Sequence, residues 1–86
     1  MGYDAQEFHP IEIIYGQAGL SASIYRCRDK DGLFYVIEFN RSGYYRQQFV
    51  TTKHFRKKHL LGLANLARRT HLRIQELKTR DSKIDT

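Results

Sequence analysis

The longest regular pattern of apolar and polar residues in this chain runs from Thr51 to Arg69. Successive residues of an α-helix lie about 100° apart around the helix axis, and this spacing divides the segment into two faces. One face is apolar apart from a histidine and gathers Phe55, His59, Leu60, Leu63, Ala64, Leu66 and Ala67. The other face is polar and gathers His54, Lys57, Lys58, Asn65, Arg68 and Arg69. The pattern predicts an amphipathic helix over residues 53–69 that packs by its apolar face and presents a cationic stripe.

The first half of the chain consists of short segments rich in branched and aromatic residues, which are typical of strands. We predict strands at residues 11–15, 23–28, 33–40 and 44–50. Glycine-containing turns separate these strands at residues 16–22, 29–32 and 41–43. Gly32 follows Asp31 and provides the positive φ angle that a short hairpin loop requires. Strand 33–40 should therefore pair antiparallel with strand 23–28.

The two ends of the helix are less sharply marked. Thr51 or Thr52 offers a hydroxyl group that could cap the helix N-terminus. Thr70 and His71 mark the expected end of the helix. Residues 72–77 alternate only in part between apolar and polar, which fits either a short final strand or a continued helix. We favour the strand.

These segments together predict an α+β fold, in which a three- to four-stranded, mainly antiparallel sheet packs against one long basic amphipathic helix. A chain of 86 residues suffices for one compact domain with little surplus. We expect an N-terminal arm or loop at residues 1–10, a single domain at residues 11–78 and a frayed tail at residues 79–86.

The net charge of +6 is distributed unevenly. Residues 51–80 contain nine Lys and Arg residues against Glu76 alone, which gives that segment a charge of +8. Such asymmetry favours a polyanionic partner, although a solvated helix face would show the same pattern. The single Cys27 cannot form an internal disulfide, and no secretory leader or long apolar segment is present. We therefore expect a cytoplasmic protein that has no membrane partner.

Catalytic and metal sites find little support in the sequence. His54 and His59 share the predicted helix, but no carboxylate or cysteine close in sequence completes a metal site, and they fall on opposite helix faces. Cys27 is expected to be a half-buried, inert thiol in a strand. The acidic residues are dispersed or belong to a turn, so no pair of carboxylates is positioned for acid–base chemistry. We expect a non-enzymatic protein without a cofactor or a metal.

The order of elements up to the helix resembles the small lobe of protein kinases. Strand, GQAG turn, strand, hairpin and a strand with the sequence VIEF follow one another in that order. Glu38 stands where the resemblance would place the lysine of the third strand, and the loop contains Gly16 and Gly19 instead of three spaced glycines. No HRD-like or DFG-like segment follows, so this resemblance implies at most a lobe without catalytic parts.

Residues 23–69 also resemble the arm-binding domains of tyrosine recombinases and the related AP2-type domains. The likeness lies in three antiparallel strands joined by short turns and followed by FVTTK and a basic helix. In those families the sheet enters the major groove of DNA. The resemblance therefore implies DNA contacts by Arg26, Arg28, Arg41, Arg46 and the Tyr44-Tyr45 pair.

Charge and side-chain chemistry predict a small nucleic-acid-binding protein, with DNA favoured over RNA. The expected role is that of a regulator or accessory factor of a bacterial or mobile genetic element. Cations neutralise phosphates, whereas Arg, Gln and Tyr side chains can address bases. The candidate contacts are Lys53, Lys57, Lys58, Arg68, Arg69, Arg46, Gln48, Arg26, Arg28 and Tyr44. The alternative is a module or inhibitor that docks on an acidic protein surface, since Leu61 interrupts the cationic stripe. An unpaired edge at residues 11–15 could also pair two copies of the chain into a homodimer.

Overall fold

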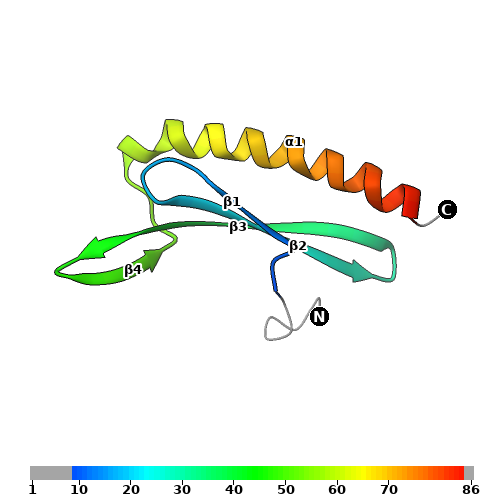
Figure 1. Cartoon of the computed structure of the whole chain (residues 1–86), viewed down its shortest axis with the longest axis horizontal. Coiled ribbons are helices and arrows are strands. Elements are labelled where there is room, and N and C mark those ends of the chain that lie inside the picture. Colours follow the sequence, from blue (N-terminus) through cyan, green and yellow to red (C-terminus); the bar gives the residue numbers. More distant parts are fainter. Residues whose placement is uncertain (1–8, 85–86) are drawn as a thin grey trace.

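The computed structural model describes residues 9–84, with side chains described as far as Asp81. Its elements in chain order are β1 (Glu12–Tyr15), β2 (Leu20–Asp29), β3 (Gly32–Tyr45), β4 (Gln48–Thr52), the short 3₁₀ helix η2 (Lys57–His59) and α1 (Leu60–Ile84). The strands form one antiparallel sheet in the order β1-β2-β3-β4, and α1 lies along one face of it (Figure 1). This arrangement confirms the predicted α+β fold with a sheet and one long helix. Most of the predicted N-terminal arm lies outside the described residues.

The register of the strands decides which side chains face the helix. Ile24 pairs with Ile37 and Ala22 pairs with Phe39, while Glu12 lies opposite Ile24 on the other side of β2. Because directly opposed residues of antiparallel strands project from the same face, these side chains share the face that α1 covers. The predicted pairing of the strands on either side of Gly32 is confirmed.

A small apolar core joins α1 to the middle of β2. Leu66 of the helix packs with Leu20 and Ala22, and all three are almost completely buried. Five partly buried side chains surround this cluster: Ile14, Ile37, Phe39, Phe55 and Leu63. Gly62 allows the close approach of the helix, since a Cβ atom at this position would lie 3.0 Å from Cδ1 of Leu20. The core therefore depends on the small size of Gly62 as well as on the apolar side chains.

The turn predicted at residues 41–43 is wrong, because β3 continues through it to Tyr45. Arg41 pairs with Leu20 on one side and with Thr52 on the other, so tertiary pairing holds this segment extended. The chain reverses instead at Arg46 and Gln47, which both have positive φ angles of 51° and 66°. Two such residues form a tight hairpin turn. Turns of this type normally favour Asn and Gly, so the local sequence does not predict a turn at Arg46 and Gln47.

The helix begins later and ends later than predicted. Thr51 and Thr52 belong to β4 and cap no helix, and regular α-helix starts at Leu60. The final strand predicted at residues 72–77 is wrong, because α1 continues through it and through residues 79–84 of the expected tail. Thr70 and Leu77 are buried at helical spacing from Leu66, and they keep one side of α1 against the sheet. Leu60 and Ala64, predicted on the inner face, are exposed.

Replacing Leu66 by Ala should destabilise the protein by about 2–5 kcal/mol, because it leaves a cavity where Leu66 packs with Leu20 and Ala22. Urea denaturation followed by circular dichroism measures this change. Leu61→Ala is the matched control, since Leu61 is 81% exposed on the same helix and should shift stability by no more than about 0.5 kcal/mol. Equal effects of the two substitutions would contradict the position of this core.

Candidate nucleic-acid interface

One end of the molecule combines the β3–β4 hairpin, the linker that follows it and the start of α1 (Figure 1). We call this region, residues 41–61, the hairpin end. It contains six Lys and Arg residues and no Asp or Glu: Arg41, Arg46, Lys53, Arg56, Lys57 and Lys58. A segment with a strong excess of positive charge is therefore also a contiguous part of the fold.

The tip of the hairpin exposes aromatic side chains. Tyr44 is 79% exposed, and its ring meets that of Phe49 edge to face, with 5.4 Å between the ring centroids. Tyr45 is 61% exposed and points from the opposite face of β3. The guanidinium carbon of Arg46 lies 5.2 Å from the centroid of the Tyr45 ring. The tip thus places flat rings next to a positive charge, as in a cation–π contact.

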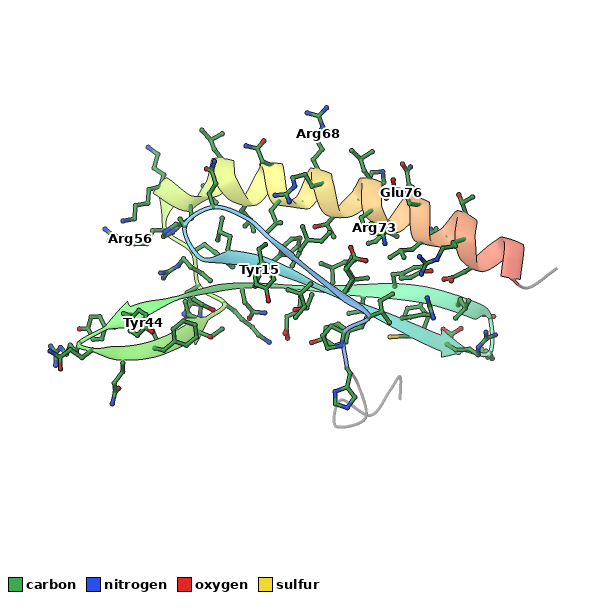
Figure 2. All side chains as sticks on the ribbon, in the orientation of Figure 1. Tyr15, Tyr44, Arg56, Arg68, Arg73 and Glu76 are labelled. Carbon is green, nitrogen blue, oxygen red and sulfur yellow. The ribbon has the colours of Figure 1, made fainter. Side chains whose placement is uncertain are left out.

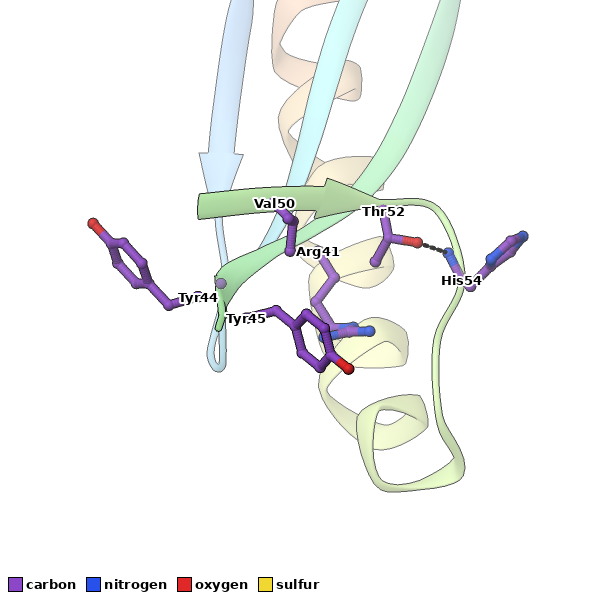
Figure 3. Close-up of a pocket in the computed structure, with 7 residues that line it drawn as sticks. Arg41, Tyr44, Tyr45, Val50, Thr52 and His54 are labelled. Carbon is purple, nitrogen blue, oxygen red and sulfur yellow. Dashed lines mark hydrogen bonds between the residues drawn. The ribbon is translucent and has the colours of Figure 1, made fainter. Parts of the chain in front are cut away.

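A hollow of about 410 Å³ opens beneath the hairpin, between its strands and the linker (Figure 3). The residues that line it are Arg41, Gly43, Tyr44, Tyr45, Val50, Thr52 and His54. The hydroxyl group of Thr52 accepts a hydrogen bond of 3.1 Å from the backbone N–H of His54, which fixes the linker where it leaves β4. Nε of Arg41 is buried and has no hydrogen-bond partner among the described residues.

A second hollow, of about 460 Å³, lies at the start of the helix and is lined by Arg56, Lys57, Lys58 and Leu61. His59 shapes this turn, because its Nδ1 accepts a hydrogen bond of 3.1 Å from the backbone N–H of Arg56. Burial lowers the pKa of His59 below its usual range, and the neighbouring Arg41, Lys58 and Arg56 lower it further. His59 thereby fixes the backbone of Arg56, which precedes Lys57 and Lys58 in the same turn.

Several other cationic side chains form ion pairs with carboxylates. Nζ of Lys53 lies 2.6 Å from Oε2 of Glu38, and this contact raises the pKa of Lys53 and lowers that of Glu38. Nη2 of Arg26 lies 3.2 Å from Oδ1 of Asp81. The other carboxylate oxygen of Asp81, Oδ2, accepts a hydrogen bond from the Tyr35 hydroxyl group.

Arg73, in the middle of α1, is also neutralised. Its Nε contacts Glu12 at 2.9 Å and its Nη1 contacts Glu76 at 3.0 Å. The side chain thereby ties the helix to β1 (Figure 2). It is an anchor of the fold and carries little free charge.

The structure brings together only part of the predicted contact set. The hairpin end contains Tyr44, Arg46, Gln48, Lys53, Lys57 and Lys58. Arg68 projects from the outer side of α1, away from the sheet (Figure 2). Nη1 of Arg69 donates a hydrogen bond of 3.2 Å to the backbone carbonyl oxygen of Tyr15. Arg26 and Arg28 lie near the opposite end of the sheet, beside the β2–β3 turn.

Arg41 and Tyr45, for which the resemblance to the arm-binding and AP2-type domains implied DNA contacts, line the hollow beneath the hairpin, and His54 lines it as well. The turn predicted at residues 41–43 did not indicate that Arg41 would be partly buried within a strand. One sequence signal could have found this region, namely the absence of any acidic residue between positions 41 and 61.

Among the described residues, no group of three or more His, Cys, Asp or Glu side chains could hold a metal ion. In the same part of the chain, no helix has the length and apolar character needed to cross a membrane. No protein-family model, curated protein or solved structure matches this chain, so its function has to be inferred from its own side chains.

His59 should make the stability depend on pH. Its folded-state pKa lies below its usual value, so the unfolded chain takes up the proton more readily. The stabilisation by neutral His59 is complete above the ordinary imidazole pKa of about 6.5 and falls as the pH drops below it. Lowering the pH from about 7.5 to about 5.5 should reduce the thermal midpoint more in the wild type than in His59→Gln. Equal reductions would contradict this role.

Proposed function

We propose that the protein is a non-enzymatic nucleic-acid-binding protein whose contact surface is the hairpin end. The observation that carries the proposal is the concentration of uncompensated positive charge there. Among the described residues, Lys53 is the only one of the six cations of the hairpin end that forms an ion pair. The remaining five are available to an anionic polymer.

The side chains of this surface suit the two components of a nucleic acid. Lys57, Lys58 and Arg56 lie at consecutive positions at the helix start and can neutralise phosphates, with release of the counterions that surround them. The exposed ring of Tyr45 on one face of the hairpin, and those of Tyr44 and Phe49 on the other, can stack on bases. Cations and aromatic rings on one surface are the usual combination for binding single strands. DNA is the first polymer to test.

A second candidate is an acidic protein partner. Leu61 is highly exposed beside Lys57 and Lys58, so the second hollow combines an apolar and a cationic contact. Such a pairing also suits an amphipathic, acidic protein segment. Capture experiments with and without nuclease treatment separate the two candidates: a partner retained after treatment is a protein, whereas one lost was bridged by nucleic acid.

Binding to DNA should weaken steeply as the salt concentration rises, because each phosphate contact releases a counterion. The double substitution Lys57→Gln/Lys58→Gln should reduce the slope of log K against log salt by about 2. Fluorescence anisotropy with labelled single-stranded and duplex oligonucleotides measures the slope.

The matched control is Lys78→Gln/Arg80→Gln, which removes the same charge from exposed positions toward the other end of α1. It should leave the slope nearly unchanged. Equal effects of the two double substitutions would show that the overall charge acts without a defined surface. Absence of DNA and RNA binding by the wild type at low salt would reject the proposed function.

A further inference from the structure

We propose that the hollow beneath the β3–β4 hairpin binds one nucleotide unit of a single-stranded nucleic acid, with the phosphate on Arg41 and the base against Tyr45. The inference rests on the proposed function and adds to it a defined subsite and a preference for unpaired strands. The hollow lies where the hairpin, the linker and the sheet meet (Figure 3).

Arg41 is built into the floor of this subsite. It lies on β3 between Leu20 of β2 and Thr52 of β4, so two neighbouring strands fix its backbone. Its side chain is half-buried, its Nε is shielded from solvent, and no acceptor among the described residues satisfies that atom. A planar guanidinium group is suited to bind a phosphate by two parallel hydrogen bonds. Arg41 forms no ion pair among the described residues, so the accessible part of its guanidinium group is available to an anion in the hollow.

The other walls supply what the rest of a nucleotide requires. The Tyr45 ring is largely exposed and lines the same hollow, so a base can lie against it. Val50 adds an apolar surface, and His54 lies at the edge of the hollow. The volume of about 410 Å³ falls within the range of sites that hold small organic ligands.

The preference for a single strand follows from the position of Tyr45. Bases in a duplex are stacked on one another and present only their edges, whereas an unpaired base offers a free face to an aromatic ring. The backbone next to Tyr45 turns sharply at Arg46 and Gln47, so the ring projects at the tip of a narrow hairpin. A duplex would have to open a base pair before a base could reach the ring.

Tyr45→Trp provides a direct test, because the chain contains no tryptophan and the substitution introduces a single fluorophore. Titration with a single-stranded thymidine oligonucleotide of about 20 nucleotides should quench its emission as the base stacks. The control is Leu72→Trp, which places the fluorophore at a similarly exposed site on the outer side of α1. Quenching at the first position alone supports the subsite, whereas equal quenching at both or at neither overturns it.

Loss-of-contact variants give a second test. Tyr45→Ala, at an exposed position where folding is not at risk, should weaken binding of the single strand about 5- to 100-fold and that of a duplex much less. Arg41→Gln should weaken it by a similar factor, and Arg80→Gln, the same change at an exposed helix position, should not. Unfolding by urea confirms that each variant is folded.

Competition separates the sources of the phosphate. Thymidine monophosphate should displace the oligonucleotide at lower concentration than either inorganic phosphate or thymidine does, because it alone offers both groups. Displacement by inorganic phosphate as effectively as by the nucleotide would overturn the base contact with Tyr45. If the wild type binds the single strand and neither the Tyr45 nor the Arg41 variant weakens binding, the subsite is wrong although the proposed function stands. If the wild type binds no nucleic acid, the proposed function fails as well.

Discussion

The packing of Leu66 against Leu20 and Ala22 is the contact on which the rest of this structure depends. The chain buries few side chains completely, and these three form the single cluster that joins the helix to the sheet in the described part of the molecule. Gly62 permits this contact because a larger residue would press against Leu20. Once α1 is seated here, its direction along the sheet fixes where its first turn meets the linker.

Polar contacts extend this attachment away from the core. Asp81 of α1 contacts Arg26 and Tyr35 of the sheet, and Arg73 of α1 contacts Glu12 of β1. Glu76 supports Arg73 from within the helix, and Glu38 of β3 pairs with Lys53 of the linker. Acids are used as anchors along the body of the molecule, and none occurs between residues 41 and 61. The positive potential of the hairpin end is therefore a consequence of how the fold distributes its few carboxylates.

The same arrangement explains why the aromatic side chains of the hairpin are exposed. β3 is longer than its neighbour β2 at this end, and only β4 pairs with its last residues, beyond the point where α1 begins (Figure 1). Tyr45, on the face that α1 covers further along the sheet, consequently has no helix over it, whereas Tyr44 and Phe49 lie on the opposite face, which no helix of the described residues covers. Pairing with β2 and β4 nevertheless holds Arg41 at the base of the hairpin, so exposed rings project from a fixed position. Rigid backbone with accessible side chains is what a binding surface requires.

The sequence by itself determined the class of the fold, the hairpin at Gly32 and the presence of one long helix. These features arise from local periods and turn residues, which act over a few positions and can be recognised without knowledge of the partners. It did not determine the length of β3 or of α1. Residues 41–43 have a local preference for a turn, and residues 72–77 have no clear period, so pairing with distant segments decided both.

The tertiary structure alone decided which cations are free. Nothing in the local sequence distinguishes the paired cations from free ones such as Lys57 and Lys58. The structure nevertheless pairs Lys53, Arg26 and Arg73 with carboxylates that lie 15 or more positions away. Charge pairing of this kind depends on the register of strands and on the face that α1 turns to the sheet. The position of Arg41 also depends on the tertiary structure, because only the extended course of β3 places its guanidinium group at the hollow beneath the hairpin.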